Sequence, residues 1–256
     1  MRKQAVLQKT IRLCVWIGCL IGIIIAIQYI DNKLSTTAAQ DPNAVQVVAI
    51  GDSLTYGSGD PKSVGYIGRV KEHLSLAWNK EVSVQRYAVR GYRTDQIMVH
   101  IQNAKAQQSI RTADYVFLFV GTNDFIQAAR RDFQTINPLE MERKRKQFEN
   151  NLYQLIGQIR RDNRHSPLIL LGMYDPYGSL LNHDQISGIL KKWNNTTFTM
   201  TKEYPNTIFI PTNKVYLHKN KEEYFSDYIH PNPKGYELLS NRVIDGMREQ
   251  GLLLEN

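Results

Sequence analysis

The sequence predicts an α/β domain in which helices cover both faces of a parallel sheet. From Val45 onward, short runs of apolar and β-branched residues alternate with longer segments whose apolar residues recur at helical spacing. Strands that alternate with helices form a parallel sheet, because each helix carries the chain back to the start of the next strand. Five such runs predict a three-layer α/β/α, flavodoxin-like domain with strand order 2-1-3-4-5.

The individual elements can be placed along the chain. The expected strands are Val45–Gly51, Val82–Val89, Tyr115–Gly121, Leu168–Met173 and Thr207–Pro211. Helical patterns lie near residues 64–78, 94–108, 139–162, 184–203 and 234–250. The clearest of these follows Asn137 and Pro138, which suit an N-cap and a first helical turn. The longest stretch without periodicity, Phe125 to Pro138, is predicted to be a loop that could form a lid or a substrate wall.

The N-terminus has the pattern of an export signal. Residues 1–12 contain four basic residues and no acidic one, and residues 13–30 contain no charged residue. An apolar stretch of this length can cross a bilayer, and its basic flank stays in the cytoplasm. We therefore predict a basic tail and transmembrane signal anchor at residues 1–30, a linker at 31–44 and an exported domain at 45–256. This layout is that of a single-pass protein of the cell membrane.

Two alternatives for the N-terminal segment stay open. The small residues Thr37 to Ala39 loosely fit a cleavage site, which would release a secreted protein. The apolar run could also be a helix buried in the core.

The composition argues against several classes of site and partner. The formal net charge is +8, but no aromatic–basic motif of a nucleic-acid-binding module is present, so we expect no nucleic-acid partner. Both cysteines, Cys14 and Cys19, lie in the N-terminal apolar run, which predicts neither a disulfide framework nor thiol chemistry. Five histidines lack paired spacing and a nearby carboxylate cluster, namely His73, His100, His165, His183 and His218. We therefore expect no metal and no cofactor. The oligomeric state stays open.

The first expected strand ends in residues suited to nucleophilic chemistry. Val45–Gly51 is followed at once by Asp52 and Ser53, and Gly57 and Gly59 close the loop. A strand that stops in this way delivers one hydroxyl at its carboxyl end, the edge at which open α/β sheets bind ligands. We predict that Ser53 is a nucleophile and that Asp52 supports its turn.

A serine nucleophile needs a general base and a residue that orients the base. Asp227 and His230 lie three residues apart, just before the last expected helix. At this spacing the carboxylate can reach the imidazole Nδ1–H and leave Nε2 free to face a serine. Taken alone, the spacing also fits a capping aspartate beside a surface histidine. The G-D-S-L stretch at residues 51–54 of the same chain favours the catalytic interpretation.

Two further loops could supply donors for an oxyanion. After the second expected strand, Gly91 allows a backbone N–H to approach a ligand closely. After the third, Asn123 offers a side-chain amide. Separately, Gly91 could be a turn glycine and Asn123 a turn or N-cap residue. Because both follow strands next to the one that precedes Ser53, the functional interpretation is favoured.

Four blocks of this sequence together resemble the SGNH or GDSL-type esterases and lipases. They are G-D-S-L-T-Y-G at 51–57, the loop around Gly91, G-T-N-D at 121–124 and D-Y-I-H-P-N at 227–232, in the order found in that family. Many relatives carry asparagine at the position of Arg86 and glycine at that of Tyr228, departures that bear on substrate preference. The membrane-anchored layout is similar to that of exported members from Gram-positive bacteria.

The resemblance implies roles for specific residues. Ser53 is expected to be the nucleophile, His230 the base and Asp227 its partner. The backbone N–H groups of Ser53 and Gly91 and the side chain of Asn123 are expected to form the oxyanion hole.

The predicted function is therefore that of an exported serine hydrolase that cleaves carboxylic esters through an acyl-enzyme on Ser53. Its expected partners are a small-molecule or lipid ester as substrate and the membrane through the N-terminal helix. A deacetylase of O-acetylated cell-wall carbohydrate is one alternative. A non-catalytic wall- or lipid-binding module that kept the fold is another.

Further side chains are expected near the strand ends. Asp124 is predicted to cap the helix that follows it. Four arginines could form a solvated rim or bind an anionic group of a substrate, namely Arg90, Arg93, Arg130 and Arg131. Five aromatic residues could line an acyl pocket or cover the sheet edge, namely Tyr56, Tyr92, Phe125, Tyr174 and Tyr177.

Overall fold

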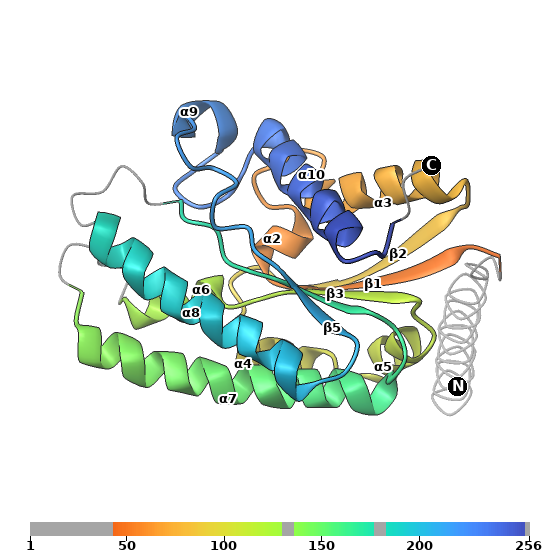
Figure 1. Cartoon of the computed structure of the whole chain (residues 1–256), viewed down its shortest axis with the longest axis horizontal. Coiled ribbons are helices and arrows are strands. Elements are labelled where there is room, and N and C mark those ends of the chain that lie inside the picture. Colours follow the sequence, from red (N-terminus) through yellow and green to blue (C-terminus); the bar gives the residue numbers. More distant parts are fainter. Residues whose placement is uncertain (1–42, 130–135, 177–182, 254–256) are drawn as a thin grey trace, which may run out of the picture. The chain divides into compact units, whose positions relative to one another are not determined.

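The computed structural model describes residues 43–129, 136–176 and 183–253 (Figure 1). Five parallel strands form one sheet of order β2-β1-β3-β4-β5, which confirms the predicted order. The strands are β1 (Val45–Gly51), β2 (Val82–Ala88), β3 (Tyr115–Phe119), β4 (Leu168–Leu171) and β5 (Thr207–Ile210). The inner strands β3 and β4 are almost wholly apolar because both faces of the sheet are covered, whereas the edge strand β2 also contains Ser83, Gln85 and Arg86 and is only partly buried.

The register of the central strands brings three chain segments to one level. Gly51 at the end of β1 lies opposite Ala88 of β2 and Phe119 of β3. The residues that follow these three strands therefore leave the sheet together, at its carboxyl edge. Ser53, Gly91 and Asn123 all lie within four residues of this level.

The helices form a layer on each side of the sheet (Figure 1). One layer holds α3 (Gly65–Trp78) and α10 (Pro233–Glu249), with the short α2 (Ser53–Tyr56) beside α3. The other holds α4 (Thr94–His100), α5 (Ala104–Arg111), α6 (Thr122–Ala128), α7 (Pro138–Asp162) and α8 (His183–Glu203). A short helix, α9 (Lys221–Tyr224), lies between β5 and α10.

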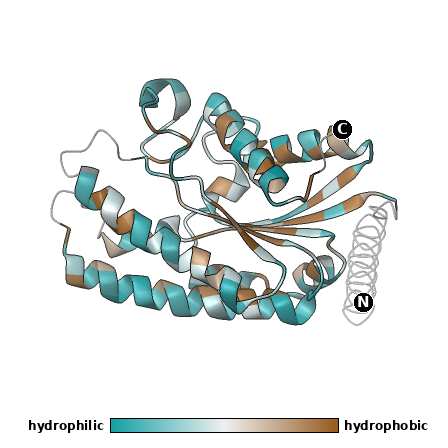
Figure 2. Cartoon of the chain, in the orientation of Figure 1, coloured by the Kyte–Doolittle hydropathy of each residue, from teal (hydrophilic) through white to brown (hydrophobic). Residues whose placement is uncertain are grey.

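Each strand contributes to two hydrophobic cores. In β1, Val48 and Ile50 pack toward α4, α5, α7 and α8, whereas Val47 and Ala49 pack toward α3 and α10. This alternation follows from the two-residue period of a strand. Figure 2 shows hydrophobic residues concentrated on the strands and hydrophilic ones on the outer face of α7. The two cores fix the strand ends that carry the candidate site.

The structure corrects the prediction of one helix near 94–108. The chain forms α4 and α5 instead, separated by residues 101–103. Asn103 explains the break, because its side chain accepts a hydrogen bond from Ala106 N–H and donates one to the His100 carbonyl. It therefore caps a new helix rather than continuing the old one.

The expected loop at Phe125–Pro138 is also partly wrong. Residues up to Ala128 belong to α6, and Pro138 is the first residue of α7. Phe125 and Ala128 are buried, and Phe125 packs edge-on against Trp193, with their ring centres 5.4 Å apart. This apolar contact with α8 stabilises a helix that the short sequence pattern does not reveal. Residues 130–135 lie outside the described residues, so the predicted lid or substrate wall stays a prediction there.

The predicted signal anchor at residues 1–30 also lies outside the described residues, as does the linker up to residue 42. In the part of the chain that the structure describes, no helix has both the length and the hydropathy needed to cross a bilayer.

Candidate active site

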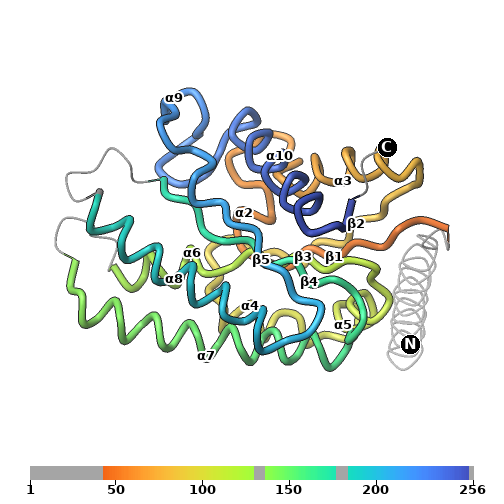
Figure 3. The backbone as a smooth tube through the Cα atoms, viewed as in Figure 1, coloured from red at the N-terminus to blue at the C-terminus, as the bar shows by residue number. Residues whose placement is uncertain are grey.

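Ser53 is the first residue of α2, directly after the turn that ends β1 (Figure 3). The Asp52 side chain caps this helix by accepting a hydrogen bond from Leu54 N–H at 3.0 Å. Gly57 ends the helix in the left-handed conformation, with φ of 94°. The predicted support of the serine turn by Asp52 is therefore present. Ser53 is held at a helix N-terminus, where its own backbone N–H lies outside the helical hydrogen bonds.

Asp227 and His230 belong to the connection between α9 and α10. Phe225 and Pro231 form an antiparallel bridge across this connection, and Ser226 N–H donates to the His230 carbonyl at 2.9 Å. Asn232 then caps α10 by accepting from Gly235 N–H at 3.1 Å. The acid and the base thus lie in a short loop whose two ends are fixed by helices.

Gly59 lets the loop after Ser53 pack against the loop of His230. It has a φ of 91°, and a Cβ at this position would lie 2.4 Å from the Pro231 carbonyl oxygen and 3.0 Å from the His230 Cβ. Any other residue would push the two loops apart. The Ser226 hydroxyl also donates to the Gly59 carbonyl at 2.6 Å. The second loop glycine noted in the sequence therefore brings the base within reach of the serine.

The three predicted side chains form one continuous chain of hydrogen bonds. His230 Nε2 lies 2.9 Å from Ser53 Oγ, and His230 Nδ1 lies 2.7 Å from Asp227 Oδ2. Asp227 Oδ1 additionally accepts from the backbone N–H groups of Ile229 and His230, at 2.9 and 2.8 Å. The second carboxylate oxygen is therefore aimed at the imidazole.

These contacts also set the charge of Asp227. Partial burial by itself would raise the pKa of the carboxyl. Hydrogen bonds from the His230 side chain and from the two backbone N–H groups outweigh this effect and lower the pKa below its usual value. Asp227 is consequently a carboxylate at neutral pH and can orient the imidazole as an acceptor.

The three predicted oxyanion donors belong to segments that follow three neighbouring strands, β1, β2 and β3. Gly91 has a φ of 77° and is exposed, and no atom lies within 4 Å of the place of a Cβ. Among the described residues, the backbone N–H groups of Ser53 and Gly91 have no protein acceptor. Asn123 lies in the first turn of α6 after the left-handed Gly121. The carboxyl edge of three neighbouring strands thus presents these donors together.

The Asn123 side chain joins the three loops at this edge. Its Nδ2 donates to the Tyr92 carbonyl at 3.0 Å and to Asp52 Oδ2 at 3.2 Å. One contact reaches the Gly91 loop, and the other reaches the turn before Ser53. The contact with Asp52 is the longer of the two hydrogen bonds and therefore the weaker one.

Two buried acids lie behind these donors. Burial raises the pKa of Asp52 to about 7, against hydrogen bonds from Leu54 and Asn123 that lower it. Burial likewise raises the pKa of Asp124 to about 6. Asp124 does not cap its own helix as predicted. It accepts hydrogen bonds from the Thr94 backbone N–H and hydroxyl, both at 3.0 Å, and so fixes the start of α4. Sequence reasoning missed this role because the partner is 30 residues away.

The arginine and aromatic residues predicted near the strand ends lie partly at the surface beside the site and partly in the hydrophobic cores. Arg93 pairs with Asp95 at 3.0 Å, and the Arg90 guanidinium lies over the Tyr56 ring. Phe125 and Tyr174 are buried, each in one of the two hydrophobic cores. Three of the predicted residues lie outside the described ranges, namely Arg130, Arg131 and Tyr177.

Arg86, one of the departures from the family pattern, has a structural role. Its guanidinium donates to the Ser63 and Val64 carbonyls at 2.6 and 3.0 Å. It thereby ties β2 to the segment that leads into α3.

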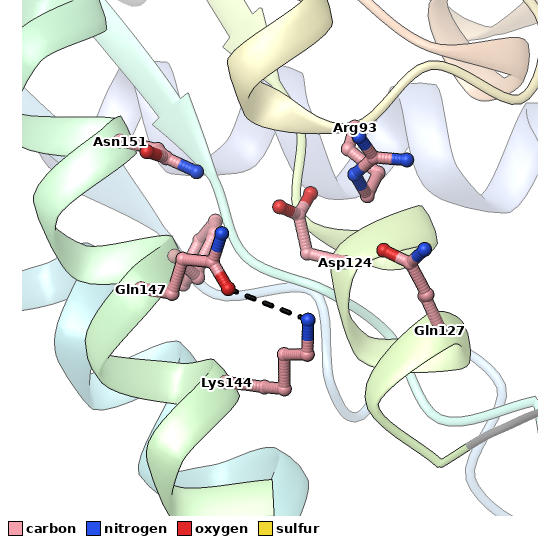
Figure 4. A pocket seen from close by; sticks show the side chains of 7 residues that line it. Arg93, Asp124, Gln127, Lys144, Gln147 and Asn151 are labelled. Carbon is pink, nitrogen blue, oxygen red and sulfur yellow. Dashed lines mark hydrogen bonds between the residues drawn. The ribbon is translucent and has the colours of Figure 1, made fainter.

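A small polar cavity lies between α6 and α7 (Figure 4). Its volume is about 20 Å³, and Arg93, Asp124 and Lys144 line it together with Gln127, Gln147, Phe148 and Asn151. This volume suits about one water molecule. None of Ser53, Asp227 and His230 lines it, so it is not the place for a substrate.

A much larger groove adjoins the acid side of the site. It has a volume of about 1370 Å³ and runs from Asp227 and Tyr228 along α8 and β5. Aromatic and lysine side chains line it, including Phe209, Tyr216, Lys191 and Lys214. The groove offers space for a bulky group beside Asp227, whereas Ser53 and His230 do not line it.

Within the described ranges, no group of three or more histidine, cysteine, aspartate or glutamate side chains is arranged to hold a metal ion. The expectation that the reaction needs no metal and no cofactor stays a prediction.

The chain matches the model of a known protein family. The model of the GDSL-like Lipase/Acylhydrolase family matches residues 49–238, which include every block described above.

Curated relatives and solved structures agree with this match. The uncharacterized protein YpmR of Bacillus subtilis strain 168 is 32% identical over 226 residues, covering 87% of this chain and 89% of YpmR. The spore germination lipase LipC of Bacillus licheniformis is 26% identical over 210 residues, covering 78% of this chain and 94% of LipC. The crystal structure of the lipase Lip_vut3 from a goat rumen metagenome shares the fold. Its TM-score is 0.70 at 23% identity, covering 79% of this chain and 97% of that one.

The raised pKa of Asp52 predicts a pH dependence of stability. In the unfolded chain this carboxyl ionises near its ordinary value of 3.8, whereas in the folded chain it keeps its proton up to about pH 7. The stabilisation is therefore complete below the unfolded pKa and is lost as pH rises through the folded one. Relative to Asp52→Asn, the free energy of unfolding of the wild type should fall by up to about 1.4 kcal/mol per pH unit between about pH 5 and 6.5.

Urea unfolding of both proteins at several pH values measures this difference. Because Asp124 is present in both, its own titration largely cancels in the comparison. Parallel stability curves for the two proteins would show that Asp52 is ionised in the folded chain across this range.

Proposed function

The chain belongs to the GDSL-like lipase/acylhydrolase family, and we propose that it hydrolyses carboxylic esters through an acyl-enzyme formed on Ser53. The observation that carries the proposal is the unbroken series of hydrogen bonds from Asp227 through His230 to Ser53 Oγ. A structural histidine has no need of a serine hydroxyl on one ring nitrogen and a carboxylate on the other. That arrangement is the one that general-base activation of a nucleophile requires.

In the first half of the reaction, Ser53 Oγ attacks the ester carbonyl carbon while its proton passes to His230 Nε2. The tetrahedral intermediate then expels the alcohol, which takes the proton back from His230 as the carbon–oxygen bond breaks. In the second half, His230 accepts a proton from water as the water attacks the acyl-serine. Collapse of the second intermediate releases the carboxylic acid, and His230 returns the proton to Ser53.

Asp227 is proposed to hold the imidazole rather than to exchange protons. Its carboxylate accepts the Nδ1–H, which selects the tautomer with a free Nε2 lone pair. Its negative charge also favours the imidazolium that forms after proton transfer. The lowered pKa of Asp227 keeps this charge in place at neutral pH.

The oxyanion is proposed to bind the N–H groups of Ser53 and Gly91 and the amide of Asn123. The two backbone donors have no competing acceptor within the residues described. In this proposal, the Asn123 N–H that donates to Asp52 donates to the oxyanion instead. The hydrogen bond to the Tyr92 carbonyl keeps the amide in place. Fixed donors of this kind stabilise the transition state without reorganisation.

A lipid or small acyl ester is the proposed substrate class. LipC, the relative from Bacillus licheniformis, is described as a lipase, and the groove beside Asp227 has room for an acyl chain or a head group. The alternative is an acetyl ester on cell-wall carbohydrate. It differs in the length of the acyl group, so comparing acetyl with octanoyl esters separates the two.

We also propose that residues 13–30 anchor the enzyme in the cell membrane with the catalytic domain outside. The support is the uncharged apolar run and its four basic residues on the N-terminal side. The full-length chain produced in a Gram-positive host should sediment with membranes and be accessible to protease added outside the cell. A shorter protein in the medium would indicate a cleaved signal instead, and a protease-resistant cytoplasmic protein would contradict export.

The central prediction concerns Ser53→Ala. This change removes the nucleophile and should lower kcat/KM for a short p-nitrophenyl ester by at least about 10⁴-fold. It should also abolish labelling by a fluorophosphonate probe. Initial rates and labelling with residues 45–256, the expected folded domain, measure both effects.

Ser58→Ala is the matched control, because it removes a hydroxyl from the same loop. The Ser58 hydroxyl is buried and has no hydrogen-bond partner among the described residues, so activity should be retained. A fully active Ser53→Ala protein would end the proposal. A wild-type protein that neither hydrolyses esters nor reacts with the probe would favour a non-catalytic binding module.

A further prediction concerns Asn123→Ala. If the amide binds the oxyanion, its loss should lower kcat by about a hundredfold to a thousandfold and leave KM nearly unchanged. A purely structural role would instead lower the thermal transition and raise KM. Steady-state kinetics together with a melting curve distinguish these outcomes, and an unchanged kcat would exclude Asn123 from the oxyanion hole.

A further inference from the structure

Arg90 is a cation held at the mouth of the candidate site. It follows β2 and directly precedes Gly91, one of the proposed oxyanion donors. Asn123 binds the Tyr92 carbonyl two residues later, which fastens this loop to the loop after β3. The segment that carries Arg90 is therefore held by β2 before it and by the Asn123–Tyr92 hydrogen bond after it.

The Tyr56 ring places the guanidinium beside α2. The Arg90 Cζ lies 4.1 Å from the ring centre, which is the geometry of a cation–π contact. Tyr56 is three residues after Ser53 in the same short helix, and residues at this spacing are neighbours on a helix surface. Tyr56 is 39% exposed and Arg90 is also exposed, so the pair faces solvent beside the helix that begins at Ser53.

The hydrogen-bond donors of Arg90 have no partner among the described residues. The nearby Arg86 and Arg93 differ, since Arg86 donates to backbone carbonyls and Arg93 to Asp95. The contact with the Tyr56 ring uses none of these hydrogen bonds, so the N–H groups stay available to a ligand. These N–H groups match the oxygens of a carboxylate or a phosphate.

Within residues 43–129, 136–176 and 183–253, no carboxylate pairs with Arg90, and the acids of the neighbouring segments have other partners. Asp60 pairs with Arg69 at 2.9 Å, Asp95 pairs with Arg93, and Asp227 holds His230. Asp52 is buried and bound to Leu54 and Asn123. Among the residues that the structure describes, Arg90 thus presents an uncompensated positive charge at the rim of the site on the Gly91 side.

We propose that Arg90 selects ester substrates that carry an anionic group, a phosphate or a carboxylate, close to the scissile bond. The inference rests on the proposed ester hydrolysis at Ser53 and names the class of substrate for it. The anion binds the outward N–H groups of Arg90 while the ester carbonyl lies against the Ser53 and Gly91 N–H groups. Tyr56 keeps the guanidinium in position before the substrate arrives, which reduces the entropy lost on binding.

Two pairs of substrates test the proposal and locate the anion. Dimethyl succinate and monomethyl succinate differ by a carboxylate on the acyl side. Monobutyrin and 1-butanoylglycerol 3-phosphate differ by a phosphate on the alcohol side. The wild type should prefer the anionic member of at least one pair, and added salt should weaken that preference.

Arg90→Gln should lower kcat/KM for the preferred anionic ester by about tenfold to a hundredfold. Its activity on the neutral esters should stay within about twofold of the wild type. Arg90→Lys keeps the positive charge but lacks the planar guanidinium. Its kcat/KM for the anionic ester should lie between those of the wild type and Arg90→Gln. Arg164→Gln is the matched control, since it removes an exposed arginine between α7 and β4, at the opposite edge of the sheet. It should leave both substrate pairs unchanged.

The outcomes separate the two proposals. An equal loss on neutral and anionic esters in Arg90→Gln would show that Arg90 only supports the loop, and the selectivity would be overturned. No preference in the wild type would overturn it as well, with ester hydrolysis intact. Failure of the wild type to hydrolyse the neutral esters would overturn the proposed function itself and the role of Arg90 with it.

Discussion

The backbone register of β1 with its two neighbours is the constraint on which the site depends. Gly51 lies level with Ala88 and Phe119, so three successive loops leave the sheet at one height. A shift of one residue in either pairing would turn the side chains of a strand to the opposite core and displace its loop. The apolar packing of Val47 and Ala49 on one face and of Val48 and Ile50 on the other prevents such a shift. The position of Ser53 relative to the segments of Gly91 and Asn123 is therefore determined by the packing of the two cores.

Buried acids complete this arrangement without a proposed part in bond making. Asp52 joins the cap of α2 to the Asn123 amide, and Asp124 joins α6 to the start of α4. Each places a carboxyl in a largely apolar environment, where burial raises its pKa. Such groups decrease stability when they ionise, but they specify one orientation for each loop. The site thus depends on polar contacts that a purely apolar interior could not supply.

Local signals in the sequence allow the strand order and most helices to be predicted. They also point to the candidate site residues, namely Ser53, Gly91, Asn123, Asp227 and His230. A strand ending in G-D-S and an aspartate three residues before a histidine are visible within a few positions of sequence. The missed features depend on distant partners. Asn103 divides α4 from α5 through its own cap, α6 is stabilised by Phe125 against Trp193, and Asp124 binds Thr94. Whether the rim arginines had acceptors could likewise be learned only from their three-dimensional neighbours.

The acid and the base are close in sequence, whereas the nucleophile is distant from both. Asp227 and His230 are three residues apart in a loop that α9 and α10 hold at either end, but Ser53 is 177 positions from His230. The contact between Asp227 and His230 can therefore persist through small movements of the domain. The contact between Ser53 and His230, by contrast, depends on the relative position of two distant segments. Local opening between the Gly59 loop and the α9–α10 connection would separate them while both cores stay packed. Thermal inactivation of such an enzyme can consequently precede global unfolding and reverse on cooling.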